Sequence, residues 1–335
     1  MTFSKLVTLI YISLKRLWLS LLICFSVFLL AFVYGTTNDP PSAYIDYILL
    51  KEQFNRSTNL RNVNMIMTGD SSGFAAFDPI FLEKQFKTMQ VQVLSSVAFV
   101  GPLGHILMAE NYLKNNHHLD ILVIAWSPFS TSSSSFPWES YVLNGTGAKI
   151  RTISRLGRAV LWEKLFLGFL NPLIPGEWGR IYVSGENFIN ALNGKNGTLA
   201  YPSSKTVINI SSPQKHYDYN LSSAFESSLR KARFVIKELP IDKVFLVITP
   251  MPDGYYGQTP EAPRKQFISK IQNLLGLPSE SLLEVPPSLP NELFSDPSHL
   301  NEKGRTVFTS IFKKSLLNGL CKSNIKTSEE CTNLL

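Results

Sequence analysis

The chain has 335 residues, of which 44% are hydrophobic and 17% are charged. This length and balance exclude a largely disordered or fibrous protein and indicate a globular domain with a sizeable core. The net charge of +7 is confined to residues 1–16 and 149–164 and the rest of the chain is balanced, so a nucleic-acid-binding surface is not expected.

An uncharged stretch at residues 17–34 is the first predicted element. Its length suits one bilayer-spanning helix, and residues 1–16 carry basic residues but no acidic one. Because positive charge stays in the cytoplasm, we expect a single-pass protein with a cytoplasmic N-terminus. The rest of the chain would be extracytoplasmic, in the periplasm or at the cell surface. A cleaved signal peptide is the competing interpretation, but Ala31-Phe32-Val33 matches the small-x-small cleavage pattern poorly.

After a linker at residues 35–61, short apolar runs alternate with helical periodicities across residues 62–318. This alternation predicts a parallel sheet with helices on both faces, a three-layer α/β/α fold. The predicted strands are 63–67, 91–97, 120–126, 243–249 and a short fifth at 282–285. The predicted helices are 74–89, 102–114, 219–239, 264–275 and 301–317. Residues 127–218 interrupt the pattern and are interpreted as an insertion.

Within the insertion, residues 149–170 have arginines at helical spacing on one face and apolar residues on another. This pattern is typical either of a basic amphipathic helix that lies on anionic lipid or docks a membrane partner, or of an ordinary surface helix. The C-terminal tail, residues 319–335, contains Cys321 and Cys331. These two form a disulfide in an oxidising compartment or remain two unrelated thiols.

Two polar motifs flank the predicted sheet. Ser71 follows the first strand in a turn that Gly69 and Gly73 allow to bend, and Asp296 and His299 lie three residues apart just before the last helix. A serine becomes a nucleophile when a base removes its proton and a third group orients that base. Sites in such sheets form at the carboxyl ends of the strands. The spacing therefore predicts a Ser71–His299–Asp296 catalytic triad.

Two further polar features receive structural interpretations. Asp70 is expected to stabilise the turn or cap a helix rather than take part in chemistry. His117, His118 and Asp120 are interpreted as surface residues, because adjacent histidines point in different directions and no Cys or Glu joins them. Accordingly, we expect neither a metal nor a cofactor.

These motifs resemble the conserved blocks of the SGNH/GDSL hydrolases. Residues 68–72 (TGDSS) resemble the first block, 296–304 (DPSHLNEKG) the last, and the glycine turn at 96–104 follows the second strand as in that family. The resemblance covers residues 62–318 and implies a flavodoxin-like sheet preceded by one transmembrane helix. It also implies that the backbone amides of Ser71 and Gly101 stabilise the oxyanion.

One block departs from the family. An Asn usually follows the third strand in a G-x-N-D setting, whereas this chain has Trp126-Ser127-Pro128-Phe129. Loss of one oxyanion donor costs about 2.7–4 kcal/mol of transition-state stabilisation. Either Ser127 substitutes for the Asn or the donor is absent. With the single anchor, this pattern looks like the membrane-anchored branch that contains alginate O-acetylation and D-alanyl transfer proteins.

The resemblance implies an extracytoplasmic serine esterase or O-acyltransferase acting on O-acyl groups of a surface or secreted polysaccharide, beside a membrane-bound O-acyltransferase. Two alternatives stay open. One is a membrane-anchored general esterase or lipase, with a lipid or small ester as its substrate. The other is a non-catalytic assembly partner of the membrane enzyme, which the altered third block favours.

Overall fold

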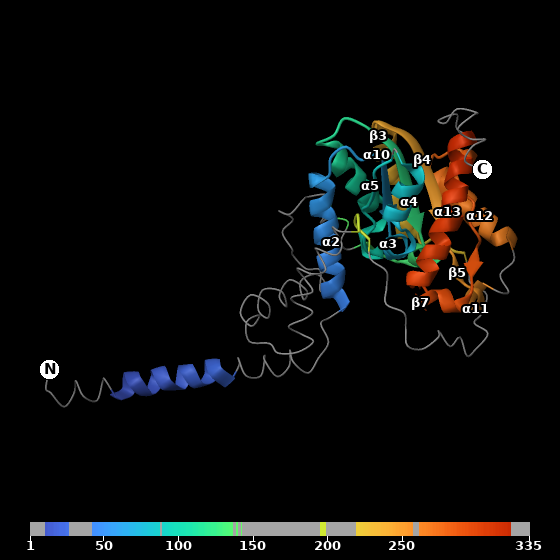
Figure 1. Cartoon of the computed structure of the whole chain (residues 1–335). Coiled ribbons are helices and arrows are strands. Elements are labelled where there is room, and N and C mark those ends of the chain that lie inside the picture. The colour runs from blue at the N-terminus through green and yellow to red at the C-terminus, as the bar shows by residue number, and fades with distance from the viewer. Residues whose placement is uncertain are drawn as a thin grey trace. The chain divides into compact units, whose positions relative to one another are not determined.

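The computed structural model describes residues 11–26, 42–87, 89–136, 139, 142, 195–198, 219–256 and 261–322 (Figure 1). The chain divides into two units. One comprises Met1–Tyr47 with Arg151–Asn187, and the other comprises Ile48–Ile150 with Phe188–Leu335. In the first unit, the described residues 11–26 and 42–47 are helical. The second unit contains the sheet and both candidate motifs.

The predicted anchor is only partly within the described residues. Residues 11–26 form a helix whose side chains are exposed, and residues 27–34 lie outside the described ranges. Among the helices that the structure describes, none combines the length and the apolar character needed to span a bilayer. The predicted anchor at 17–34 thus extends beyond the residues that the structure describes.

The four predicted main strands form one parallel sheet in the order β2-β1-β3-β4. Their bounds are Met65–Gly69 for β1, Val91–Val93 for β2, Leu119–Trp126 for β3 and Ile241–Ile248 for β4. Gly69 is paired with Ala125, and Ala125 with Val247, so the carboxyl ends of the three longer strands lie at one edge. The sheet's largely buried, apolar strands explain why the sequence reveals them so clearly.

The predicted fifth strand is reduced to a single bridge. Leu282 is bridged to Leu246, and the amide of Leu283 donates to the carbonyl of Leu246 at 2.9 Å. Pro286 and Pro287 follow, and a proline has no amide hydrogen to continue a ladder. The prediction of a strand at 282–285 is therefore wrong beyond this first contact.

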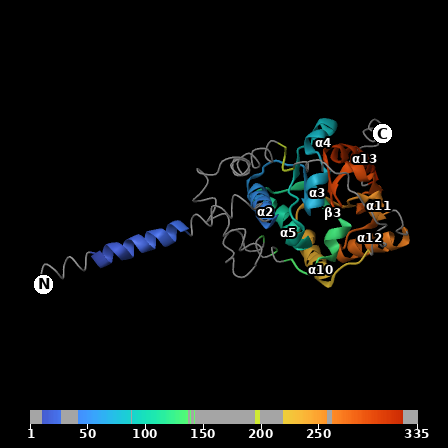
Figure 2. The ribbon, with the colours of Figure 1, turned by 90° about the horizontal axis from the view of Figure 1, so that it is seen from below.

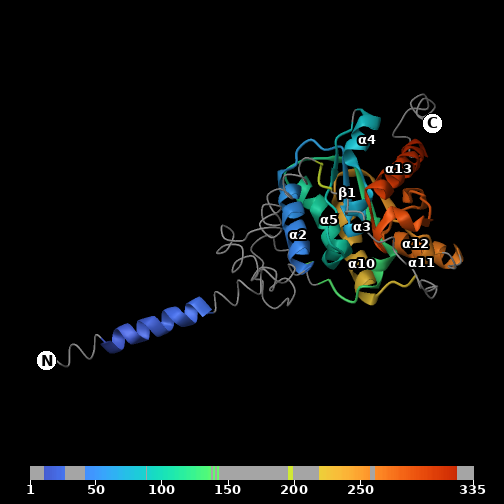
Figure 3. The ribbon, with the colours of Figure 1, turned by 60° about the horizontal axis from the view of Figure 1, so that its bottom comes forward.

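Helices cover both faces of the sheet. On one face the side chains of β1, β2 and β3 pack against α3 (Ser71–Ala76), α4 (Pro79–Phe86) and α13 (Glu302–Lys322). Figure 2 and Figure 3 show α13 beside α3, where Thr309 Oγ1 donates to the carbonyl of Ala76. On the other face lie α5 (Gly101–Leu113) and α10 (Ser223–Glu238), which α12 (Glu261–Leu275) contacts. The two-residue alternation of each strand supplies both cores.

Part of the predicted linker is helical. Residues Ser42–Asn59 form α2, and its Leu49, Leu50 and Phe54 are buried. These residues recur at helical spacing, which indicates a packed helix. The linker interpretation is wrong for residues 42–59, because turn-forming residues at 36–42 masked the pattern that follows them.

Little of the predicted insertion lies within the described residues, and its basic stretch at 149–170 lies outside them. The described turn at 195–198 lies beside β2: the amide of Val93 donates to the carbonyl of Asn196 at 2.9 Å. Gln53 of α2 donates to the carbonyl of Gly197 at 2.8 Å. This turn therefore borders the sheet at its β2 edge.

Two of the three cysteines are within the described residues. Cys321 is disulfide-bonded, and Cys24 is free and exposed. The third, Cys331, lies outside the described residues.

Candidate active site

Ser71 is the first residue of α3, immediately after β1 and the turn residue Asp70. Gly69 ends the strand at a φ of +150°, and a Cβ atom there would lie 1.8 Å from the carbonyl oxygen of Ala125. Only glycine allows β1 to approach β3 this closely with that backbone conformation. The Ser71 side chain is thereby fixed at the carboxyl edge of the sheet, where α3 begins.

Asp296 and His299 lie on a small antiparallel hairpin of β7 (Phe294–Asp296) and β8 (His299–Leu300). Oδ1 of Asp296 accepts hydrogen bonds from the backbone amides of Ser298 at 2.8 Å and His299 at 3.0 Å. This tight turn leaves Oδ2 of Asp296 2.7 Å from Nδ1 of His299. The carboxylate thus holds the imidazole in one orientation.

The structure brings the three predicted triad residues together. Nε2 of His299 lies 2.8 Å from Oγ of Ser71, although 228 positions separate the two residues in sequence. With Nδ1–H donating to Asp296, Nε2 is the ring nitrogen that accepts the Ser71 hydroxyl hydrogen. Both contacts fall within the reach expected for a nucleophile, its base and the group that orients the base.

Electrostatics favour an ionised Asp296. Partial burial raises the pKa of this carboxyl, but the hydrogen bond and charge of His299 and the two backbone amides lower it, and the net pKa lies below its usual value. An ionised Asp296 stabilises the positive charge that His299 acquires when it takes a proton.

Asp70 has the structural role that the sequence predicts. It is buried, and its Oδ1 accepts from the amides of Ser72 at 2.9 Å and Gly73 at 3.4 Å, which caps α3. Its Oδ2 accepts from the amide of Ser127 at 2.8 Å. One side chain therefore joins the first turn of α3 to the loop after β3.

The three predicted oxyanion donors differ in their contacts. The amide of Ser71 has no hydrogen-bond partner among the described residues, as an oxyanion donor requires. The amide of Gly101 instead donates to the carbonyl of Ala98 and closes a 3-10 turn. The prediction for Gly101 therefore needs correction: the local turn uses the hydrogen that the oxyanion would need.

Ser127 is connected to the site by the hydrogen bond from its amide to Asp70, the residue before Ser71. Its amide is used by Asp70, and its Oγ accepts from the amide of Phe129 at 3.2 Å. Within the described part of the chain its hydroxyl hydrogen has no recorded acceptor. The hydroxyl, rather than the amide, is thus the group of Ser127 that is left to donate.

The sequence analysis missed polar residues behind the site. Buried His105 of α5 accepts a hydrogen bond at Nδ1 from Nε1 of Trp126 at 3.0 Å, and its Nε2 lies 3.2 Å from the carbonyl of Val97. Burial lowers the pKa of His105 to about 4, despite opposing effects of Asp70 and of the Val97 carbonyl. The neutral ring therefore connects β3 to the loop after β2.

Further polar residues end the strands at the same edge. Oγ1 of Thr249, directly after β4, lies 2.9 Å from Oγ of Ser72. The hydroxyls of Ser95 and Ser96, after β2, are buried and have no hydrogen-bond partner among the residues that the structure describes. The amide of Ser96 donates to the carbonyl of Gly69 at 2.9 Å. A hydroxyl residue one or two positions past each of the four strands of the sheet was the available sequence signal.

No protein-family model matches this chain, and a search of the curated proteins finds no match either. The case for a function therefore comes from the geometry of the site and from the sequence motifs.

Proposed function

We propose that this chain is a serine esterase or O-acyltransferase of the SGNH type. The observation that carries the proposal is the pair of contacts at His299: Nε2 lies 2.8 Å from Oγ of Ser71, and Nδ1 lies 2.7 Å from Oδ2 of Asp296. The strand order β2-β1-β3-β4 supports it, because flavodoxin-like sheets have the order 2-1-3-4-5 and place their sites at the carboxyl edge.

In the proposed reaction, Oγ of Ser71 attacks the carbonyl carbon of an ester while its proton passes to Nε2 of His299. Collapse of the tetrahedral intermediate breaks the bond to the leaving alcohol, which takes that proton from His299, and an acyl-Ser71 remains. A second alcohol or water then gives its proton to His299 and attacks the acyl group, and Ser71 recovers its hydrogen. Asp296 holds the ring throughout and stays ionised.

Negative charge on the intermediate requires donors near Ser71. We assign the Ser71 amide and the Ser127 hydroxyl to this role. The first lacks a partner in the described part of the chain, and the second has a hydrogen without a recorded acceptor there. A serine hydroxyl stabilises the oxyanion less well than the Asn side chain that SGNH hydrolases use at this position. We therefore expect slow transfer of the acyl group to water and faster transfer when an acceptor alcohol is bound.

For the substrate, we propose O-acyl groups of an extracytoplasmic polysaccharide, with a membrane-bound O-acyltransferase as partner. Support comes from the uncharged stretch at residues 17–34 behind a basic N-terminus, which favours a membrane anchor with the site outside the cytoplasm. The disulfide at Cys321 agrees with an oxidising compartment.

A fluorophosphonate probe tests the chemistry, because it labels a serine only when an adjacent base activates it. Full-length protein should be labelled at Ser71, as peptide mapping by mass spectrometry would show, and Ser71→Ala and His299→Ala should abolish labelling. Ser298→Ala is the matched control, since Ser298 donates to Asp296 through its backbone amide. Labelling that persists in Ser71→Ala would overturn the proposal.

The same variants separate the candidate functions. Loss of glycan O-acyl groups in cells that carry Ser71→Ala, together with little hydrolysis of p-nitrophenyl esters by wild-type protein, supports transfer. Rapid Ser71-dependent turnover of those esters supports a general esterase. Full glycan acylation in both Ser71→Ala and His299→Ala would instead indicate a non-catalytic assembly partner.

A further inference from the structure

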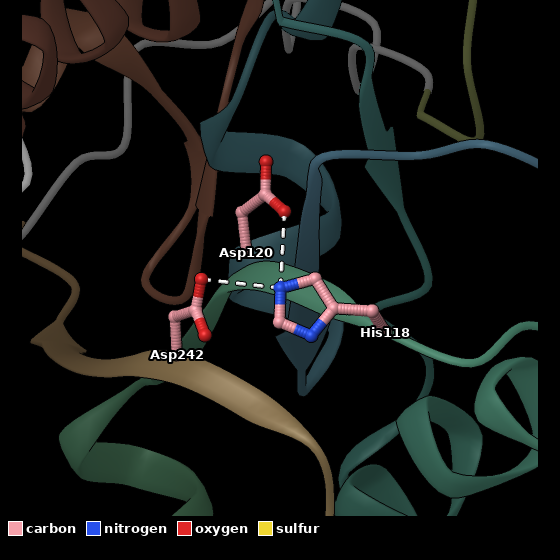
Figure 4. Close-up of side chains that lie close together, drawn as sticks. All are labelled: His118, Asp120 and Asp242. Carbon is pink, nitrogen blue, oxygen red and sulfur yellow. Dashed lines mark hydrogen bonds and ion pairs between the residues drawn. The ribbon is translucent and has the colours of Figure 1, made fainter.

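A second group of polar side chains lies at the opposite edge of the sheet, where β3 and β4 begin. His118 precedes β3, Asp120 is its second residue, and Asp242 is the second residue of β4. Figure 4 shows one ring nitrogen of His118 facing both carboxylates, with a dashed line to each. Its Nε2 lies 3.1 Å from Oδ2 of Asp242 and 3.4 Å from Oδ1 of Asp120. The sequence brought His118 and Asp120 together, but Asp242 joins them only through the fold.

Strand register forces the two carboxylates to face each other. Leu119 is paired with Ile241 and Ile121 with Lys243, so Asp120 and Asp242 occupy equivalent positions on adjacent parallel strands. Such neighbours are about 4.8 Å apart and their side chains point to the same face. Like charges at directly opposed positions are destabilising, so a positive group between their oxygens would relieve the repulsion.

One imidazole hydrogen cannot satisfy both carboxylates. Nε2 of His118 carries at most one hydrogen, yet it faces two carboxylate oxygens at 3.1 and 3.4 Å. If that hydrogen points at Asp242, Oδ1 of Asp120 receives no hydrogen bond from His118 and is still repelled by the Asp242 carboxylate. A cation that accepts one electron pair from Nε2 and one from each carboxylate satisfies all three groups.

We propose that His118, Asp120 and Asp242 bind a divalent transition-metal ion. Their three ligand atoms lie within 4.8 Å of one another, so small side-chain adjustments place them around one ion. One imidazole and two carboxylates form a mixed nitrogen and oxygen set, which suits Zn²⁺, Ni²⁺ or Co²⁺ better than Ca²⁺ or Mg²⁺. With side chains 45–59% exposed, water completes the coordination.

A neighbouring amide orients one ligand. Nδ2 of Asn64 donates to Oδ2 of Asp120 at 2.9 Å, which leaves Oδ1 to face His118. Oδ1 of Asn64 in turn accepts from the amide of Gln90 at 2.9 Å, so the amide cannot rotate without losing a contact. Hydrogen bonds of this kind hold metal ligands in place.

The bound ion would connect the starts of β3 and β4. Ser71 and His299 lie near the far ends of these strands, roughly 20 Å away by the rise of an eight-residue strand. The metal therefore takes no part in the proposed acyl transfer. Its effect is stability, since an ion that binds only the folded state raises the unfolding temperature.

Thermal unfolding of the full-length, tag-free protein near pH 7.5 tests the site, because the ligands must be deprotonated. Zn²⁺ or Ni²⁺ in about hundred-fold excess over its dissociation constant should raise Tm by about 5 °C, and calorimetric titration should give one ion per chain. Asp242→Asn and His118→Ala should abolish the shift, and Asn64→Ala should weaken binding about ten-fold. His117→Ala is the control, since His117 is exposed and adjacent but outside the cluster.

The Tm of each variant without metal shows whether the substitution itself prevents folding. Asp242→Asn removes one of two opposed charges, so without metal it should unfold at the wild-type temperature or above. An equal metal-induced shift in wild type and Asp242→Asn, or a loss in His117→Ala as large as that in His118→Ala, would overturn the proposal. Absence of any shift with Zn²⁺, Ni²⁺ and Co²⁺ would also overturn it.

Discussion

Oδ2 of Asp70 accepts a hydrogen bond from the backbone amide of Ser127 at 2.8 Å, and this contact ties the loop after β3 to the residue that precedes the proposed nucleophile. Oδ1 of the same carboxylate caps α3. The two oxygens of Asp70 therefore set the position of Ser71 relative to Ser127, both of which we assign to the oxyanion site.

Asp70→Asn should separate these two roles. The Asn carbonyl can still cap α3, but its NH₂ group would face the Ser127 amide, which leaves a buried donor unsatisfied at a cost of about 1–3 kcal/mol. We expect urea unfolding to show that loss, with a lower kcat and a nearly unchanged KM. Asp78→Asn is the matched control, because Asp78 caps α4 through the amide of Phe81 alone. Equal effects of both substitutions would contradict this role for Asp70.

Gly69→Ala should disrupt the site from the backbone. The new Cβ would lie 1.8 Å from the carbonyl oxygen of Ala125, at a φ of +150°, so β1 must move away from β3. Overpacking of this kind costs about 1–3 kcal/mol, and we expect fluorophosphonate labelling of Ser71 to slow with it. Gly73→Ala provides the comparison: its Cβ would lie 3.0 Å from the Ser95 hydroxyl, 3.1 Å from the Ala125 methyl and 3.4 Å from the Ala125 carbonyl oxygen. A Gly69→Ala variant with wild-type stability and labelling would show that β1 can shift without consequence.

Removal of the imidazole of His105 should weaken the connection between α5 and β3. His105→Gln keeps a donor toward Val97 but removes the acceptor of Trp126, which leaves the indole N–H unsatisfied and costs about 1–3 kcal/mol. Trp126→Phe removes that donor instead. Unfolding free energies of the two single variants and the double variant form a thermodynamic cycle. Additive losses would show that the 3.0 Å contact between these side chains contributes nothing.

His105 also predicts an acid-sensitive fold. Burial lowers the pKa of His105 from 6.5 to about 4, so the unfolded chain binds a proton more readily than the folded one between these values. The stability that His105 contributes is therefore complete above pH 6.5 and is lost as the pH falls toward 4. Unfolding free energy measured across this window should decline more steeply in wild type than in His105→Gln. Parallel pH profiles would refute the assignment.

Asp296 should affect stability at a lower pH than His105 does, and it should also affect catalytic activity. Because the net pKa of Asp296 lies below the usual value of 3.8, the stability that its ionisation contributes is present above that value and is lost as the pH falls through the folded-state pKa. At neutral pH, Asp296→Asn should keep the fold but lower kcat by about 10³- to 10⁴-fold, since an amide no longer holds His299 in the required tautomer. A loss of less than ten-fold would indicate that Asp296 does not orient the base.

Much of the fold was predictable because its information is local. The apolar runs of β1, β3 and β4 are buried and stand out against the helical periods between them. The prediction of a fifth strand was wrong because two prolines follow its first contact. The helix α2 was missed because the turn-forming residues before it led us to extend the predicted linker to residue 61. Both errors concern the extent of a single strand or helix, and the predicted order of sheet and helix layers is unaffected.

The candidate site divides in the same way. The order of Ser71, Asp296 and His299 along the chain is visible in the sequence, and the rule that sites form at the carboxyl edge of a parallel sheet places Ser71 there. The β7–β8 hairpin brings His299 and Asp296 to that edge only in the folded chain. The Gly101 prediction fails because its amide hydrogen closes a local turn onto Ala98, a conformation that the letters Gly-Pro do not specify. His105 lay inside an ordinary helical pattern, and nothing in its neighbours indicated the bond to Trp126.

By itself, the sequence determined the four strands of the main sheet, the sharp turn that Gly69 permits, and the residues that are candidates for a nucleophile and a base. These follow from the preferences of residues close together in the chain. The tertiary structure alone decided that His299 lies 2.8 Å from Ser71 across 228 positions and that Asp242 faces Asp120 on the neighbouring strand. Such contacts depend on how the strands and loops of the whole domain pack together. The sequence around either residue therefore does not indicate its distant partner.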